Sequence, residues 1–222
     1  IDCDPQGNTT SGFGVDKNEQ ENTIYELVLG ECSIGDCIIQ DVIHNISLIP
    51  ANVNLAAAEI ELIGVDHKEY ILKNEVDYVK DNYDYVIIDT PPNLGFLSLN
   101  SFMASDFIVT PLAADSFSLK AIRLLKNTLD EVREESDRQI PVAGMLLTKY
   151  SHRTNVSKLL EKSIEEASKL LDTSLFKTRI RQATVVQESQ IAKLNLFDYA
   201  PKAPVTKDYD EFIAEFLERI EG

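Results

Sequence analysis

The sequence predicts an α/β fold, with a mainly parallel sheet covered by helices on both faces. Short apolar runs alternate with segments whose apolar residues recur at helical spacing, which is typical of βαβ units. Residues 85–88 are rich in valine and isoleucine, as expected of a fully buried central strand, and the run ends at Asp89. Open α/β sheets bind ligands at the carboxyl ends of their strands, so Asp89 is a candidate magnesium ligand. A buried strand that simply ends in a turn aspartate is the alternative.

The composition is that of an ordinary globular protein. Of the 222 residues, 44% are hydrophobic and 26% are charged. No apolar run approaches the roughly 20 residues that cross a bilayer, and the sequence does not open with a signal-peptide pattern. We therefore expect one domain over residues 1–222 and a cytoplasmic location. Cys3, Cys32 and Cys37 form neither a CxxC pair nor an even set, which favours free thiols in a reducing compartment.

Charge is unevenly distributed along the chain. The net charge of -16 argues against nucleic acid as a partner, because Lys and Arg supply most non-specific affinity for phosphate. Between Arg138 and Lys207, however, twelve Lys or Arg stand against six Asp or Glu, a local balance of +6 that leaves -22 elsewhere. Both a basic region on an acidic body and scattered solvated side chains fit this pattern.

Local signals place the other elements. Residues 23–26 form a capping box that starts a helix ended by Gly30. A short strand is expected over 47–50, and Asn54 starts an alanine-rich helix to Ile63. Further helices are predicted over 67–82, 97–104, 116–136, 154–172, 185–193 and 206–221, and strands over 106–111, 140–148 and 175–180. The apolar residues expected to face the core of these helices are Ile71, Leu72, Val76, Val79, Ile122, Leu125 and Leu129.

A second acidic strand end lies at the start of the chain. Asp2 and Asp4 are two residues apart, so they share one face of an extended segment. Two such carboxylates can position a water, hold a cation or act as an acid/base pair. Paired loop-capping aspartates are the alternative.

Residues 2–14 resemble the D-x-D-P-Q-G-N-x-T-x-G-x-G segment of the ParA/Soj family of partitioning ATPases. The similarity continues in the family's order through residues 49–62, 82–95 and 146–150 to a closing amphipathic helix, so it covers nearly the whole chain. It implies a P-loop NTPase-like fold, ATP and Mg2+ as cofactors, and ATP-dependent partitioning of plasmid or chromosome DNA.

The resemblance also implies roles for individual residues. The position that matches Asp4 helps to position the attacking water, with Asp2 supporting it, and Asp89 holds magnesium through water. Residues 90–95 would sense the γ-phosphate, with two prolines as a rigid hinge. Nucleotide contacts would come from Thr90, Pro91, Pro92, Thr148 and Lys149, and a plain strand end is the alternative for Thr148 and Lys149.

The family's phosphate-binding loop has no match in this sequence. Neither G-x-x-x-x-G-K-[ST] nor a Gly-rich loop with two lysines occurs in it. In the family that loop lies about one βα unit upstream of the match to residues 2–14. We therefore expect that the first βα unit is missing from this chain. This chain would then bind ATP weakly or not at all, and the activity would belong to the intact protein.

The partners implied by the resemblance are a second copy of the chain, DNA and a ParB-type protein. An ATP-bound homodimer would bind nucleoid DNA without sequence preference, and the ParB-type partner would stimulate hydrolysis. Alternatively, the acidic body receives a basic peptide from the partner. Many family members place another arginine in the segment that matches residues 182–186, where this chain has none. The candidate DNA contacts are Lys177, Arg179, Arg181 and Lys193.

Three other interpretations of the sequence compete with this one. A MinD-like positioning ATPase would need a basic membrane helix, whereas residues 208–221 are acidic and are expected to pack on the core. A haloacid-dehalogenase-type phosphatase also begins with hydrophobic-D-x-D, but it needs Thr or Val where Gln6 stands. A non-catalytic partner-binding or scaffolding module would keep the fold, and ATP would neither bind to it nor change its oligomeric state.

Overall fold

The computed structural model describes residues 1–136, 138–151 and 155–221. Its contacts divide the chain into two compact units, Ile1–Ser105 and Asp106–Gly222, and each is described by itself. The expected single domain over residues 1–222 remains a prediction. Among the described residues, no helix is both long enough and apolar enough to span a membrane.

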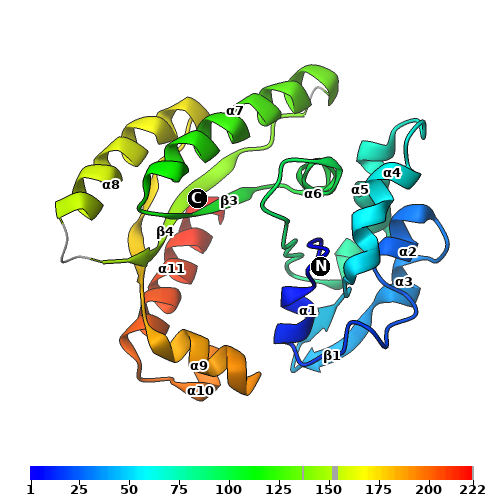
Figure 1. Cartoon of the computed structure of the whole chain (residues 1–222), viewed down its shortest axis with the longest axis horizontal. Coiled ribbons are helices and arrows are strands. Elements are labelled where there is room, and N and C mark those ends of the chain that lie inside the picture. The colour runs from blue at the N-terminus through cyan, green and yellow to red at the C-terminus, as the bar shows by residue number, and fades with distance from the viewer. Residues whose placement is uncertain (137, 152–154, 222) are drawn as a thin grey trace. The chain divides into compact units, whose positions relative to one another are not determined.

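The first unit is mainly helical and carries one small antiparallel sheet (Figure 1). Strands β1 (Ile39–Ile43) and β2 (Ile46–Leu48) pair antiparallel. The sequence predicted a short strand at 47–50 but not its partner β1. The helices are α1 (Asn8–Gly12), α2 (Ile24–Leu29), α3 (Ile34–Cys37), η1 (Val53–Ala57), α4 (Ala58–Glu61), η2 (Lys68–Tyr70), α5 (Ile71–Val79), η3 (Lys80–Asn82) and α6 (Phe96–Ala104).

Helix α2 starts and ends as its sequence predicts. The Thr23 hydroxyl accepts a hydrogen bond from the Tyr25 N–H at 3.2 Å, and the Glu26 carboxylate accepts one from the Thr23 N–H at 2.8 Å. These two bonds satisfy backbone donors that the first helical turn leaves unpaired. Gly30 then ends the helix in the left-handed conformation, with φ of 74°.

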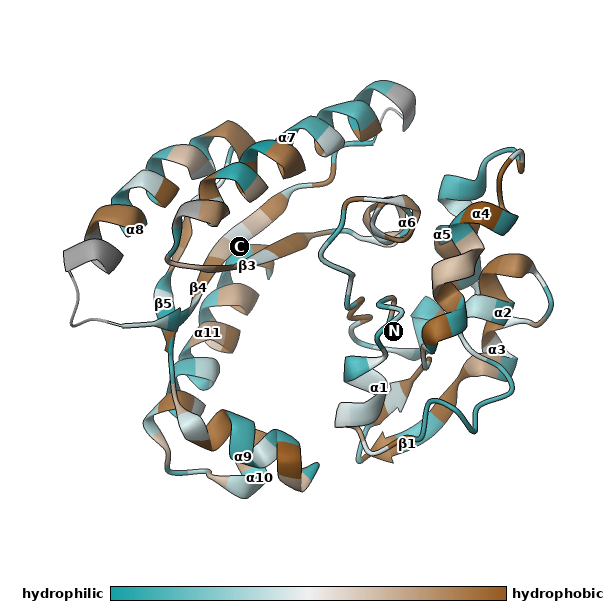
Figure 2. Ribbon diagram, viewed as in Figure 1, coloured by the Kyte–Doolittle hydropathy of each residue, from teal (hydrophilic) through white to brown (hydrophobic). Residues whose placement is uncertain are grey.

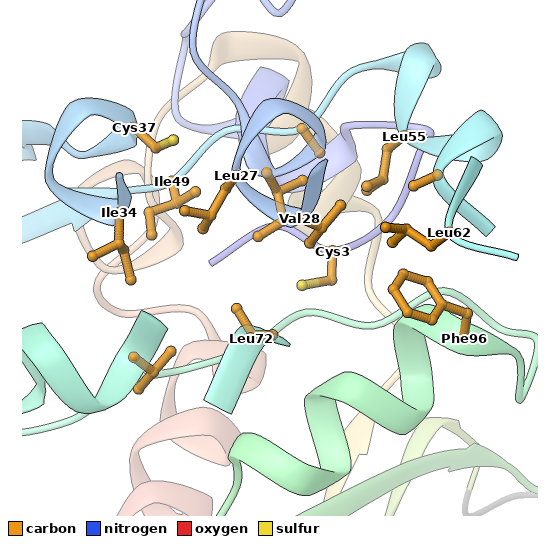
Figure 3. Close-up of a cluster of buried hydrophobic side chains, with 14 residues drawn as sticks. Cys3, Leu27, Val28, Ile34, Cys37, Ile49, Leu55, Leu62, Leu72 and Phe96 are labelled. Atoms are coloured by element: carbon orange, nitrogen blue, oxygen red, sulfur yellow. The ribbon is translucent and has the colours of Figure 1, made fainter. Parts of the chain in front are cut away.

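The core of the first unit lies between α2, the η1–α4 segment and α5. Figure 3 shows side chains from these elements meeting in one cluster, with Leu72 and Phe96 on one side of it. Leu27, Leu55 and Leu72 are each 1% exposed. Leu72 and Val76 therefore face the core as the helical spacing of 67–82 predicts.

The prediction of a fully buried central strand over residues 85–88 is wrong, because these residues form no regular strand and most of them are exposed. Asp89 forms an isolated parallel bridge with Asp2, and Ile87 accepts a hydrogen bond from the amino group of Ile1. Tyr85, Val86 and Ile87 are 56%, 37% and 79% exposed. A strand is buried on both faces only where other elements cover both of them, and an apolar sequence does not reveal whether they do.

The second unit contains the parallel sheet that the sequence predicts. Strands β3 (Ile108–Ala113), β4 (Val142–Tyr150) and β5 (Leu175–Arg181) pair in that order, all parallel. In Figure 1, α7 and α8 cover one face of the sheet and α11 covers the other. The helices are α7 (Ser116–Ser136), α8 (Asn155–Ser168), η4 (Lys169–Leu171), α9 (Thr184–Ala192), α10 (Leu196–Tyr199) and α11 (Pro204–Glu221). The helix predicted over 154–172 corresponds to α8 and η4, and its first residue, 154, lies outside the described residues.

Hydropathy explains how α7 is placed. Figure 2 shows β3 as largely hydrophobic, whereas α7 mixes hydrophilic and hydrophobic residues. The apolar residues of α7 recur at helical spacing, and Ile122, Leu125 and Leu129 are 0%, 6% and 1% exposed. Their burial as one stripe confirms the predicted inward face of this helix.

The closing helix α11 packs on the sheet, as predicted. Phe212 meets Phe176 of β5 edge to face, with ring centroids 5.0 Å apart. The Arg219 guanidinium lies 4.1 Å from the centre of the same Phe176 ring. The Glu215 carboxylate accepts hydrogen bonds from the backbone N–H groups of Lys177 (2.7 Å) and Thr178 (2.9 Å). The acidic helix α11 can therefore pack on the sheet, because the Glu215 carboxylate is paired with backbone N–H groups of β5.

Candidate functional site

In the first unit, the segment that contains Asp2 lies beside the segment that ends at Asp89, and the two are joined by a parallel bridge. The Cys3 N–H donates to the Asp89 carbonyl at 2.8 Å, and the Asp89 N–H donates to the Ile1 carbonyl at 2.9 Å. On the other side, the Asp2 N–H donates to the Ile49 carbonyl at 3.0 Å. The segments around Asp2, Ile49 and Asp89 are distant in sequence and lie side by side in the structure. The loop that follows Asp2 therefore begins next to Asp89.

The Asp2 side chain is fully buried and connects neighbouring segments through hydrogen bonds. Its side chain is 0% exposed and accepts hydrogen bonds from the Thr10 N–H (2.8 Å), the Thr10 hydroxyl (2.7 Å) and the Asp4 N–H (3.2 Å). A buried carboxylate is tolerated only with such donors. The Thr10 hydroxyl in turn accepts from the Ala51 N–H at 3.0 Å. Asp2 therefore holds α1 and the segment at Ala51 in place.

Asp4 differs from Asp2 because it is only half-buried. One of its carboxylate oxygens accepts a hydrogen bond from the Gln6 N–H at 2.9 Å, and its carbonyl accepts one from the Gly7 N–H at 2.8 Å. Gly7 has φ of 60°, and a Cβ atom there would lie 2.8 Å from the Ala51 carbonyl oxygen. Only glycine fits this position, and the resulting tight turn fixes the direction of Asp4.

Asp89 is exposed and is joined to the opposite loop by Thr9. The Thr9 hydroxyl donates to the Asp89 carboxylate at 2.5 Å. Thr9 has no predicted role, although it lies in the segment that carries the family resemblance. Hydroxyl and carboxylate oxygens are the hard ligands that magnesium prefers. Within the described ranges no group of three or more His, Cys, Asp or Glu could hold a metal ion. Magnesium usually needs only one or two carboxylates, together with substrate phosphates and water.

The loop after Asp89 leads into α6. Thr90 is half-buried, Pro91 is buried and Pro92 is exposed. The Ser98 hydroxyl donates to the Asn93 carbonyl at 2.6 Å, so the first turn of α6 anchors the far end of this loop. The loop therefore starts and ends on ordered elements.

Thr148 and Lys149 belong to the second unit, at the end of β4. The Thr148 hydroxyl donates to the Leu112 carbonyl at 3.4 Å. Lys149 is exposed and has φ of 50°, where the pairing of β4 with β5 shifts register between Leu147 and Tyr150. A left-handed lysine in a strand is uncommon and is held there by its surroundings.

The candidate DNA contacts also lie in the second unit. Lys177, Arg179 and Arg181 occupy alternate positions of β5, whereas Lys193 follows α9. Arg179 pairs with Glu161 at 2.5 Å, and Arg181 pairs with Asp208 at 2.6 Å. Lys177 and Lys193 are exposed. The charges of the two arginines are thus neutralised by carboxylates of α8 and α11.

The net charge differs strongly between the units. The first unit has four lysines, no arginine and eighteen Asp or Glu, a net charge of -14. The second unit has seventeen Lys or Arg and nineteen Asp or Glu, a net charge of -2. Phosphate backbones would be repelled by the first unit far more than by the second.

Comparison with known proteins identifies the family. The model of a family described as an AAA domain matches residues 1–142. The sporulation initiation inhibitor protein Soj of Bacillus subtilis is 34% identical over 215 residues, which cover 97% of this chain and 84% of Soj. The chromosome-partitioning ATPase Soj of Treponema pallidum is 30% identical over 219 residues, covering 99% of this chain and 84% of that protein. The chain belongs to the Soj/ParA family of partitioning ATPases.

A solved structure extends the comparison to the fold and the cofactors. Cobyrinic acid a,c-diamide synthase from Mycobacterium smegmatis, with a bound ATP analogue and magnesium, superimposes with a TM-score of 0.74 at 27% identity. The match covers 86% of this chain and 76% of that chain. The Soj relatives confirm the predicted family, and the structural match confirms the predicted α/β fold. The ATP analogue and magnesium bound to this structural relative agree with the cofactors predicted from the sequence. Family membership also removes the haloacid-dehalogenase-type alternative.

Proposed function

We propose that this protein uses Mg2+-dependent ATP hydrolysis to partition plasmid or chromosome DNA. The observation that carries this proposal is the bridge between Asp2 and Asp89, which brings the loop after Asp2 next to Asp89. The parallel bridge between Asp2 and Asp89 supports roles for Asp4 and Asp89, because α/β folds bind ligands where parallel segments end side by side.

The three aspartates have different environments, and we assign them different roles. Asp4 is half-buried in a fixed turn, so it can orient the attacking water. Asp2 is buried and fully bonded to its own loop, so it positions Asp4 and does not touch substrate. Asp89 and Thr9 offer oxygens that suit magnesium, which neutralises phosphate charge when it is bound.

In this proposal, the loop after Asp89 and the end of β4 each have a role of their own. Thr90, Pro91 and Pro92 respond to the γ-phosphate, because their loop begins at Asp89 and is anchored on α6. Thr148 and Lys149 contact the base, a role supported by the exposed, left-handed backbone at Lys149.

The partners in this proposal are a second copy of the chain, non-specific DNA and a ParB-type protein, in the nucleoid region of the cytoplasm. The charge difference between the units supports contact with DNA through the second unit. Lys177 and Lys193 are exposed there, and Arg179 and Arg181 are held by carboxylates. Lysine side chains therefore contribute most of the contact with phosphate.

The test of this proposal is Asp4→Ala in the full-length protein. ATP turnover should be abolished, while ATP-dependent dimerisation persists. Asp81→Ala is the matched control, because Asp81 is an exposed carboxylate of the same unit in η3. Unchanged turnover in Asp4→Ala would refute the role of Asp4. A wild-type protein that neither hydrolyses ATP nor dimerises with it would instead support the scaffolding alternative.

A further inference from the structure

A pair of thiols lies outside the nucleotide site, at the start of α3. The Sγ atoms of Cys32 and Cys37 are 3.2 Å apart. This separation is only about 1.2 Å longer than the S–S bond of a disulfide. Cys37 is 1% exposed and Cys32 is half-buried, so one thiol is accessible and the other is protected behind it.

The capping of α3 explains why these cysteines meet. Ser33 is the N-cap residue, and the Asp36 carboxylate accepts hydrogen bonds from the Ser33 N–H (3.1 Å) and hydroxyl (2.6 Å). Cys32 then precedes the cap and Cys37 is the fourth helical residue. Side chains at these two positions pack together in the hydrophobic staple of a capped helix. The contact therefore follows from local sequence.

The environment of Cys37 also fixes its direction. Its thiol lies at one end of the buried cluster in Figure 3, near Ile34 and Ile49. The same sulfur lies 3.4 Å from the Thr23 carbonyl oxygen, to which the thiol can donate. Cys37 is thus held between the core and Cys32.

We propose that Cys32 and Cys37 form a reversible dithiol–disulfide couple that reacts with low-molecular-weight disulfides such as oxidised glutathione. The accessible Cys32 thiolate attacks one sulfur of the oxidant, forming a mixed disulfide and releasing one glutathione thiolate. Cys37 then loses its proton to solvent and attacks the Cys32 sulfur. The bond from Cys32 to glutathione breaks, and a second glutathione thiolate leaves. Two protein thiols are oxidised and one oxidant disulfide is reduced to two thiols.

The order of attack follows from burial and hydrogen bonding. Burial raises the pKa of both thiols, while the hydrogen bond between them acts to lower the pKa of Cys32 and further raises the pKa of Cys37. Cys32 is therefore the attacking thiol and Cys37 the resolving thiol. Burial raises the pKa of Cys3 to about 12, and Cys3 is 1% exposed, so it stays unreactive.

Intact-mass spectrometry of the folded full-length protein after incubation with oxidised glutathione tests the couple. The wild type should lose two hydrogen atoms and regain them with dithiothreitol. Cys37→Ala, which keeps an apolar side chain at the buried position, should retain one glutathionyl group at Cys32. Cys32→Ala should remain unmodified, and Cys3→Ala should behave as the wild type does.

Two results would overturn this assignment. One is a stable glutathionyl adduct on wild-type Cys32, because it would show that Cys37 cannot resolve the mixed disulfide. The other is an unchanged wild-type mass under conditions that oxidise the urea-unfolded chain. Peptide mapping after alkylation keeps the test valid if a variant folds poorly, since in the wild type it must locate the bridge between Cys32 and Cys37.

Discussion

Replacing Thr10 by valine should destabilise the first unit strongly. The substitution keeps the side-chain shape but removes a hydroxyl that is 0% exposed and makes two hydrogen bonds. The hydroxyl donates to the Asp2 carboxylate at 2.7 Å and accepts from the Ala51 N–H at 3.0 Å. The variant leaves Asp2 with one donor fewer and the buried Ala51 N–H without its partner.

The size of the effect follows from these two losses. A hydrogen bond to a charged group contributes about 1.5 to 3 kcal/mol, and an unsatisfied buried N–H costs about 1 to 3 kcal/mol. Asp2 keeps its backbone donors, so we expect a total near 3 kcal/mol. With a urea dependence of roughly 2 kcal/mol per molar, the unfolding midpoint should fall by about 1.5 M.

Equilibrium urea unfolding followed by circular dichroism measures this change. Thr9→Val is the matched control, because the neighbouring Thr9 hydroxyl is bonded to the exposed Asp89. Its midpoint should move by less than about 0.5 M, because solvent weakens the exposed bond to the Asp89 carboxylate to about 1 kcal/mol or less. Equal midpoints for Thr10→Val and the wild type would refute the claim that the hydrogen bonds of Thr10 with Asp2 and Ala51 stabilise the first unit.

Three further predictions concern the second unit. Burial alone would raise the pKa of Glu215, but its backbone and Arg219 hydrogen bonds outweigh burial and lower it below the usual 4.5. The stability that Glu215 contributes is therefore lost as pH falls below about 4.5, and acid unfolding of Glu215→Gln should show less pH dependence than that of the wild type. Gly144→Ala should lower the free energy of unfolding by about 1 to 3 kcal/mol, because the Cβ of the alanine would lie 2.7 Å from Phe176 Cζ. An unchanged midpoint in thermal or urea unfolding would contradict the close packing of Gly144 against Phe176. In salt-dependent DNA-binding assays, Lys177→Gln should weaken binding more than Arg181→Gln does, because the charge of Arg181 is already paired with Asp208. The reverse order would show that Lys177 is not a main contact with DNA phosphate.

Local signals in the sequence predicted much of the fold. The capping box at Thr23 and Glu26 gave both the start of α2 and its hydrogen bonds. Helical spacing predicted the buried face of α7 at Ile122. These features depend on residues within a few positions of one another, so single-sequence reasoning reaches them.

Features that depend on distant residues could not be predicted in the same way. The exposure of Ile87 depends on what covers it, which its own apolar character does not reveal. The ion pairs of Arg179 and Arg181 join β5 to α8 and α11, whose carboxylates are 18 and 27 residues away. The contact of Thr9 with Asp89 spans 80 residues.

The contact between Cys32 and Cys37 was not predicted, although it depends on local sequence. Cys32 and Cys37 flank a capping box of Ser33 and Asp36, and their staple positions predict the contact that the structure shows. Counting cysteines and looking for CxxC spacing does not detect this arrangement. Reading cap positions along with cysteine spacing would have found it.

The magnesium requirement of ATP hydrolysis in Asp89→Asn tests the central claim most directly. The measurement is the Mg2+ concentration that gives half-maximal turnover in the full-length protein, compared with the wild type and Asp81→Asn. If Asp89 and its partner Thr9 hold the magnesium of the nucleotide site, this concentration should rise at least roughly tenfold in Asp89→Asn, with an unchanged urea midpoint. The same requirement in Asp89→Asn and the wild type would contradict the assignment of Asp89 to the catalytic magnesium site.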